Sequence, residues 1–151
     1  MSFVVSRLSN VLRAVWDEQG ANAAVAVLLK LDGGKLRVLF VRRVRNSRDP
    51  WSGQMALPGG KREAKDRNLK ETVIRETLEE TNINLLENCR FLGAMPAFQS
   101  KPRPETRVLP FVVLVEDEQS IRLNENELEE YFWVSVEELV RNRTRVGLGF
   151  G

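Results

Sequence analysis

Hydrophobic residues recur along the chain with two different periods, and these periods predict its helices and strands. Between Phe3 and Trp16 the apolar residues fall at helical spacing, which predicts that residues 1–18 form an N-terminal amphipathic helix packed on the domain. The stretches NAAVAVLLKL and KLRVLFVRRV flank DGG, a pattern typical of two strands joined by a tight hairpin. The chain therefore opens with a helix and a hairpin.

The remaining pattern predicts a mixed sheet between helices. Gly, Pro, Ser and Asn predominate in RNSRDPWSGQMALPGG, which predicts a loop with a short strand at Gln54 to Leu57. A helix is expected from Arg67 to Thr81 and another from Ser135 to Arg143, whereas CRFLGAMPAF, TRVLPFVVLVE and EYFWV are expected to be strands. This order indicates one α/β domain over residues 1–151, with helices on both faces of the sheet.

The composition excludes several kinds of catalytic and metal site, but it says little about the fold. The formal net charge is +2, so global charge gives no reason to expect nucleic acid or an anionic membrane as a partner. The chain has one cysteine and no histidine, which excludes the usual Cys/His zinc sites and Ser-His catalysis. No apolar run approaches the ~20 residues that span a bilayer. We expect a soluble, cytoplasmic protein, and the apolar N-terminal helix could also serve to form a homodimer.

Three glutamates fall on one side of the predicted helix. Glu76, Glu79 and Glu80 occupy an arc of about 100°, and like charges at this spacing repel by roughly 0.2–0.5 kcal/mol per pair. A hard divalent cation such as Mg²⁺ or Mn²⁺ would relieve that repulsion, while a solvated acidic face is the alternative. The Gly-rich loop at 58–60 and the expected left-handed cap at Asn82 fix the carboxylates relative to the loop, which favours the metal site.

The stretch from Gly60 to Ile83 resembles the signature of the Nudix hydrolases, G-x5-E-x7-R-E-U-x-E-E-x-G-U, where U is a bulky apolar residue. Arg75-Glu76 matches the R-E pair and Glu79-Glu80 the E-E pair. The departures are Asp66 for the first Glu, one extra residue before Arg75, Thr77 for the apolar residue, and Asn82 for the last Gly. These features, together with SGQMALPGG before the signature, look like the coenzyme A diphosphatase-like branch. The resemblance extends from about Ala23 to Leu139.

The resemblance implies a Nudix-type α/β/α sandwich that hydrolyses a diphosphate linked to a nucleoside, using divalent metals and water. It makes Glu76 and Glu80 the strongest candidate metal ligands, with Glu79 as ligand or base and the Gly60 carbonyl as a further ligand. Arg75 would orient the glutamates. We also expect the Glu80 carboxylate to be exposed, so that its removal would cost little stability.

A further carboxylate in this family often comes from a loop before the last strand. In LNENELEEYFWV the candidates are Glu125 and Glu127, and Glu127 is chosen here as a catalytic residue. A solvated acidic loop is the alternative interpretation. Asp66 is assigned to structure, because a lone Asp near a helix start is usually a cap or a dipole partner.

Basic and aromatic residues near the loop are candidates for binding the nucleotide. Arg side chains can hold phosphate oxygens with a bidentate fork, but alternation along a strand sends Arg42 and Arg43 to opposite faces, so at most one should reach the site. Trp51 and Phe98 could stack on a nucleobase, although burial in the core is the commoner role of an aromatic. The predicted substrate-binding set is Arg42, Arg48, Lys61, Trp51 and Phe98.

The substrate remains open at this stage. Coenzyme A is the first candidate, and ADP-ribose, dinucleoside polyphosphates and oxidised nucleoside triphosphates are alternatives. A second class of function is a nucleotide-binding module that keeps the fold without turnover. The concentrated carboxylates argue against that class, because a pure binder has no need of them.

Overall fold

One mixed sheet of eight strands runs through the residues that the computed structural model describes, which are 3–45, 53–101 and 103–141. Its central order is β3-β2-β1-β7-β5, while β4 also pairs with β1, β6 with β7, and β8 with β2. The elements in chain order are α1 (Phe3–Val11), β1 (Ala23–Asp32), β2 (Lys35–Arg43), β3 (Met55–Ala56), β4 (Gly59–Lys61), α2 (Leu69–Thr81), β5 (Cys89–Ala94), β6 (Phe98–Gln99), β7 (Arg107–Val115), β8 (Leu128–Ser135) and α3 (Val136–Arg141).

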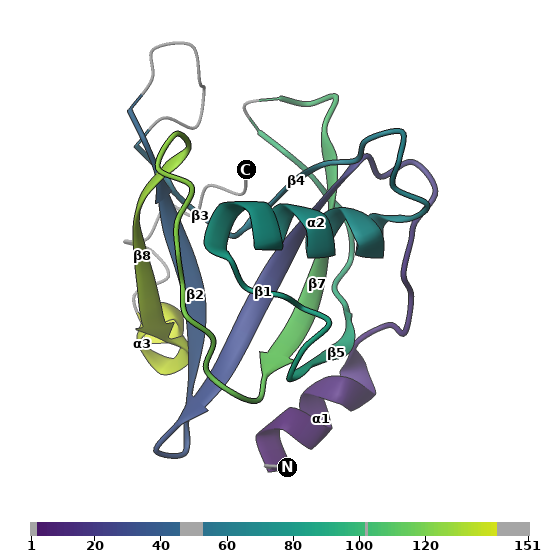
Figure 1. Ribbon diagram of the computed structural model, residues 1–151. Coiled ribbons are helices and arrows are strands. Elements are labelled where there is room, and N and C mark those ends of the chain that lie inside the picture. The colour runs from purple at the N-terminus through teal and green to yellow at the C-terminus, as the bar shows by residue number, and fades with distance from the viewer. Residues whose placement is uncertain (1–2, 46–52, 102, 142–151) are drawn as a thin grey trace.

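Helices cover both faces of this sheet, which confirms the predicted fold class. On one face α2 lies across β1 and β7 (Figure 1), and its Leu69 and Val73 are buried against Leu28 and Phe111 of those strands. Alternate residues of the same strands, such as Val25 and Val112, face the other side and form a second core. There they meet apolar side chains of α1 and α3. The period-2 pattern thus divides the strand side chains between two cores.

The ends of α2 are fixed by two asparagines. Asn68 is the N-cap, and its side-chain oxygen accepts a hydrogen bond of 2.9 Å from the Glu71 backbone N–H. At the other end Asn82 adopts a left-handed conformation with φ of 68°, and its N–H donates to the Leu78 carbonyl at 2.9 Å. The predicted cap at Asn82 is therefore confirmed. The two caps therefore define where α2 begins and ends.

The N-terminal segment departs from the prediction, because the helix expected to reach Trp16 ends at Val11. Arg13 instead exchanges two backbone hydrogen bonds with Ala94, of 3.1 and 2.8 Å, so pairing with the sheet edge replaces the next helical turn. Trp16 is 57% exposed, and the Lys70 ammonium lies 4.8 Å from the centre of its ring. The Trp16 carbonyl also accepts a hydrogen bond from the Lys70 N–H, which ties this segment to the start of α2.

A short strand, β4, was missed because its sequence, Gly59-Gly60-Lys61, has a low strand propensity. It pairs antiparallel with the start of β1, where Gly59 lies opposite Val25 and Gly60 opposite Ala24. Gly59 is required by close packing, since a Cβ there would lie only 2.2 Å from the Ala24 carbonyl oxygen. The loop before α2 is therefore attached to the centre of the sheet.

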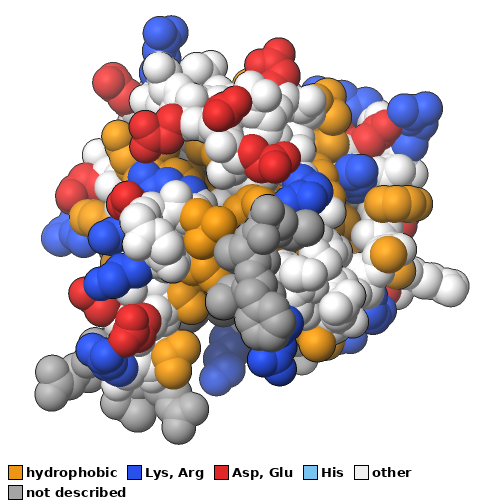
Figure 2. Space-filling model, turned by 90° about the horizontal axis from the view of Figure 1, so that it is seen from below, with side chains coloured by type: hydrophobic (Ala, Val, Ile, Leu, Met, Phe, Trp, Pro, Cys, Tyr) orange, Lys and Arg blue, Asp and Glu red, His pale blue; other side chains and the backbone are white. Residues whose placement is uncertain are grey.

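Some large hydrophobic side chains are exposed at the surface, where charged side chains surround them (Figure 2). Val11 and Leu86 are the most exposed of the large hydrophobic residues. In the view from below, hydrophobic side chains gather near the middle of the face, with Lys, Arg, Asp and Glu side chains around them (Figure 2). Within the described ranges, no helix has the length and hydropathy needed to cross a bilayer.

Replacing Gly59 by alanine should destabilise the protein by about 3 kcal/mol or more, because the added Cβ meets backbone atoms that cannot move independently. Gly34→Ala is the matched control: Gly34 has a φ of +82°, but a Cβ there meets no atom within 4 Å. This control should lose about 1 kcal/mol through backbone strain alone. Urea unfolding of both variants measures the difference, and equal losses would contradict the packing argument.

Candidate functional site

Carboxylates from two separate parts of the chain border one small cavity at the starting ends of β1 and β7. Its volume is about 190 Å³. Two basic residues and a short glycine-rich stretch share its wall with the carboxylates. Its lining residues are Ala23, Arg43, Gly59, Gly60, Lys61, Glu76, Glu80, Thr106 and Glu127. The structure thus brings Gly60, Lys61, Glu76, Glu80 and Glu127 of the predicted set together.

Glu80 is the most deeply buried carboxylate of the cavity. Only 3% of the residue is exposed, which corrects the expectation that its side chain faces solvent. The last turns of α2 pack against β4, and Glu80 Oε1 accepts a hydrogen bond of 2.8 Å from the Gly59 N–H. Burial is the main cause that raises the pKa of Glu80 to about 8. The charges of Glu76 and Glu127 act in the same direction, whereas the Gly59 hydrogen bond and Arg43 oppose the rise.

Glu76 lies against the glycine-rich strand one turn earlier on α2. A Cβ on Gly60 would come within 2.6 Å of the Glu76 carboxyl carbon, so glycine at that position leaves room for the carboxylate. Burial raises the pKa of Glu76, the Arg75 guanidinium lowers it, and the charges of Glu79 and Glu127 raise it. For both Glu76 and Glu80, removal from water is therefore the main cause that disfavours the ionised form of the carboxylate.

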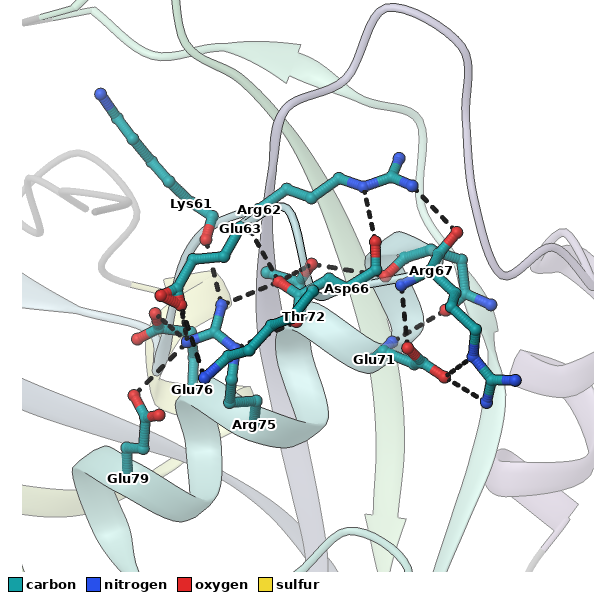
Figure 3. A network of polar contacts seen from close by, with 12 residues as sticks. Lys61, Arg62, Glu63, Asp66, Arg67, Glu71, Thr72, Arg75, Glu76 and Glu79 are labelled. Atoms are coloured by element: carbon teal, nitrogen blue, oxygen red, sulfur yellow. Dashed lines mark hydrogen bonds and ion pairs between the residues drawn. The ribbon is translucent and has the colours of Figure 1, made fainter.

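Arg75 holds the outer side of this cluster through several contacts at once (Figure 3). Its guanidinium donates to Glu76 at 2.9 Å and to Glu79 at 3.4 Å, and it also reaches the Lys61 carbonyl at 3.3 Å. The Glu79 side chain is half exposed, so it lies at the rim of the cluster. Figure 3 shows the Lys61 side chain extending away from Arg75, while its carbonyl faces the guanidinium.

Asp66 fixes Arg75 from the opposite side. It accepts hydrogen bonds of 3.1 and 2.8 Å from the guanidinium, a bidentate pair that also raises the pKa of Arg75. The hydrogen bonds from Arg75, and lesser ones from Glu63 and Thr72, hold the pKa of Asp66 well below its usual range despite burial. Asp66 is thus not the helix cap. It anchors the arginine that contacts the glutamates.

Glu127 reaches the cavity from the loop before β8. Its N–H donates to the Asn124 carbonyl at 3.0 Å, and its carbonyl accepts from the Val44 N–H at 2.9 Å, which ties the loop to the end of β2. Glu125, the other candidate in this loop, is not among the residues that border the cavity. Geometry therefore places the chosen glutamate of the pair beside the carboxylates of α2.

Strand alternation does send Arg42 and Arg43 apart, as expected, but Arg43 is the one at the cavity. The Arg42 guanidinium lies 5.4 Å from the centre of the Phe132 ring and 3.9 Å from Glu130. The pairing of β2 with β8 shifts register between the two arginines, and this irregularity has no signal in the sequence. Sequence reasoning therefore had no means of choosing between them.

The remaining predicted residues lie elsewhere. Phe98 is partly buried against the second hydrophobic core, and it is not among the lining residues. Arg48 and Trp51 fall outside the described residues. Ala23 and Thr106 border the cavity but were not predicted, because only the parallel pairing of β1 with β7 brings them there.

The donor set fits a hard divalent cation. Carboxylate oxygens are the ligands that Mg²⁺ and similar ions prefer, and Mg²⁺ usually takes only one or two of them together with water and substrate oxygens. In the described part of the chain, no group of three or more acidic, histidine or cysteine side chains is placed so as to hold a metal ion by itself. A cation here would therefore bind a few protein oxygens and leave positions for water or a phosphate.

Solved structures with the same fold were found by comparison. A Caenorhabditis elegans Ap4A hydrolase in a binary complex superposes with a TM-score of 0.65 at 20% identity, covering 79% of this chain and 83% of that one. The Nudix domain of Shewanella oneidensis NrtR, in complex with ADP ribose, gives a TM-score of 0.61 at 18% identity and covers 99% of this chain and 91% of that one. At these identities the likeness shows the fold.

Sequence comparison gives relatives at higher identity. A C. elegans protein named peroxisomal coenzyme A diphosphatase ndx-8 is 32% identical over 151 residues, which is 94% of this chain and 63% of that protein. The chain spans 63%, 33% and 50% of the length of three curated relatives that it matches. A model of the NUDIX domain matches residues 20–148, a region that includes both sides of the cavity. The chain therefore belongs to the Nudix family.

Proposed function

We propose that this chain hydrolyses the diphosphate bond of a nucleoside diphosphate derivative, with coenzyme A as the first candidate substrate and a divalent metal as cofactor. The buried Glu80 carboxylate, held beside Glu76 and Glu127 in one cavity, is the observation that carries the proposal. Burying like charges together is costly, and a bound cation offsets that cost. The relative named coenzyme A diphosphatase supports the choice of first substrate.

The metal would be held by Glu76 and Glu80, with the Gly60 carbonyl and Glu79 as further ligands. Nudix hydrolases generally need divalent metal ions, and we propose Mg²⁺ or Mn²⁺ because all these donors are oxygens. When bound, such an ion offsets the negative charge of the phosphate oxygens and makes water more acidic. The hydrogen bond from the Gly59 N–H holds Glu80 in place before any ligand arrives.

The remaining polar groups of the chain would orient and move protons. Arg75, fixed by Asp66, holds the side chains of Glu76 and Glu79 in position. Glu127 comes from the loop before β8 rather than from α2, so it borders the cavity without belonging to the helix that carries the proposed ligands. We assign Glu127 as the base that accepts a proton from the attacking water, with Glu79 as the alternative.

Phosphate binding is assigned to the basic side of the cavity. Arg43 and Lys61 border it and would meet the oxygens of the diphosphate. Arg42 contacts Glu130 and Phe132, which favours a structural role for it. Arg48 and Trp51 stay predictions for phosphate binding and base stacking, and the cytoplasmic location and the homodimer stay predictions as well.

The alternative substrates would undergo the same reaction, which is hydrolysis of a phosphoanhydride bond. The solved relatives named above are an Ap4A hydrolase and a Nudix domain in complex with ADP ribose. Dinucleoside polyphosphates and ADP-ribose are therefore the next candidates for this chain, followed by oxidised nucleoside triphosphates. A nucleotide-binding module that keeps the fold without turnover is the second class of function.

A substrate panel with product identification by mass tests the proposal. Coenzyme A, ADP-ribose, diadenosine polyphosphates and nucleoside triphosphates are each incubated with Mg²⁺, with Mn²⁺ and with chelator. We expect metal-dependent release of 3′,5′-ADP and 4′-phosphopantetheine from coenzyme A. Cleavage of another member alone would replace the substrate. Absence of cleavage with every metal, together with nucleotide binding, would favour the non-catalytic alternative.

Glu80→Gln should lower turnover by about 100-fold or more, because a neutral amide cannot hold a cation against the phosphate charge. The variant should remain folded, since the amide oxygen can still accept the Gly59 hydrogen bond. Glu87→Gln is the control, because Glu87 is exposed and does not border the cavity. Steady-state rates at saturating Mg²⁺ test this prediction. Equal rates for Glu80→Gln and wild type would contradict the assignment of Glu80 as a metal ligand.

The metal-free protein should lose stability as the pH rises. Because the folded pKa of Glu80 is about 8 and its ordinary value is 4.5, the folded state retains a proton that the unfolded chain releases. This contribution is complete below the ordinary pKa and is lost as pH rises toward 8, at up to about 1.4 kcal/mol per pH unit. Urea unfolding in chelator at pH 5 and 8 measures the loss. Glu80→Gln should flatten this dependence, and a steeper dependence in the variant would contradict the assignment.

A further inference from the structure

Thr106 lies on the wall of the cavity, directly before β7, and hydrogen bonds of its neighbours hold its backbone in place. Asn22 holds both of its neighbours: the Asn22 side-chain amide donates to the Glu105 carbonyl at 3.1 Å and accepts from the Arg107 N–H at 2.9 Å. The Asn22 N–H also donates to the Arg107 carbonyl at 3.0 Å. These three hydrogen bonds fix the backbone on either side of Thr106 against the start of β1.

The hydroxyl of Thr106 is the unsatisfied part of this arrangement. The backbone groups of Thr106 are paired, because its N–H donates to the Arg103 carbonyl at 2.9 Å and its carbonyl accepts from the Ser100 N–H at 2.8 Å. Its Oγ1 is buried and has no hydrogen-bond partner among the described residues, and the residue is only 3% exposed. Leaving a buried hydroxyl unpaired is costly, and valine would fill the same space without that cost.

The neighbours of Thr106 on the cavity wall indicate which ligand would use this hydroxyl. Ionised Glu76, Glu80 and Glu127 can only accept hydrogen bonds, whereas a hydroxyl can also donate one. A diphosphate offers non-bridging oxygens that accept such bonds. Because Oγ1 and the methyl group branch from the same Cβ, rotation about one bond exchanges their positions without moving the backbone.

We propose that Thr106 is a substrate-positioning residue whose hydroxyl donates a hydrogen bond to a non-bridging oxygen of the diphosphate bound in the cavity. This inference rests on the proposed function, since it takes the diphosphate as the ligand. Donation from a fixed hydroxyl to an anionic oxygen orients the diphosphate relative to the carboxylates of α2. It also satisfies the polar group that is unpaired in the ligand-free protein.

The test compares Thr106→Val, which removes the hydroxyl while keeping the shape, with Thr106→Ser, which keeps the hydroxyl. Calorimetric titration with ADP in Mg²⁺ should show at least about tenfold weaker binding for the valine variant and near wild-type affinity for the serine variant. On the panel substrate that wild type cleaves, kcat/KM should fall by a similar factor in Thr106→Val alone. Equal ADP affinities for wild type and Thr106→Val would overturn the assignment.

Ser100→Ala supplies a matched control. Ser100 is also 3% exposed, its Oγ has no partner among the described residues, and it lies at the other end of the same loop, but it does not border the cavity. Its loss should leave ADP affinity and turnover unchanged. An equal loss in Ser100→Ala would show that loop structure, rather than contact with the ligand, is responsible.

Thermal unfolding in chelator separates a binding role from a structural one. If the Thr106 hydroxyl has no partner in the free protein, Thr106→Val should unfold at the same or a higher temperature than wild type. A lower unfolding temperature would show a structural partner and overturn the proposal.

If wild type neither cleaves the panel nor binds ADP, the proposed function fails and this assignment fails with it. If wild type cleaves a panel substrate and Thr106→Val behaves like wild type, the assignment of Thr106 fails while the proposed function stands.

Discussion

The hydrogen bond from the Gly59 N–H to the Glu80 carboxylate is the contact on which the rest of the site depends. It joins the end of α2 to β4, and β4 is in turn paired with β1 at the centre of the sheet. A carboxylate would not otherwise stay buried at this depth, because the transfer of its charge from water is costly. The same contact therefore fixes the helix, the glycine-rich strand and the position of the negative charge.

Charge around this contact is arranged in two layers. The inner carboxylates, Glu76 and Glu80, face the cavity and have raised pKa values because burial disfavours their ionised forms. The outer layer contains Arg75 and Asp66, whose mutual hydrogen bonds favour the charged form of each. The ion pair on the outside thus restrains Glu76, while the Gly59 N–H restrains Glu80. Burial disfavours the ionised form of both inner carboxylates, which suits them to receive a cation.

The sequence predicted local features well and long-range ones poorly. Helical periodicity and the asparagine at position 82 were sufficient to predict α2 and its cap, because both are set by neighbours in the chain. The burial of Glu80 was not predictable, since it depends on packing against β4 rather than on the helix itself. Arg42 was predicted to bind substrate, whereas Arg43 borders the cavity. The pairing with β8 shifts register between these two residues, and no local pattern in the sequence indicates that shift. Thr106 reaches the site only through strand pairing, which leaves no local pattern.

Parallel pairing of β1 with β7 has a consequence for the order in which the protein folds. The two strands are neighbours at the centre of the sheet, yet residues 33–106, about half of the chain, lie between them, so their pairing closes a very long loop. Contacts of this kind form slowly and late. A chain emerging from the ribosome would carry the whole of α2 well before β7 and Glu127 exist to complete the opposite wall. Glu76 and Glu80 would then lack the opposite wall of the cavity, and Glu127, until the final strands arrive.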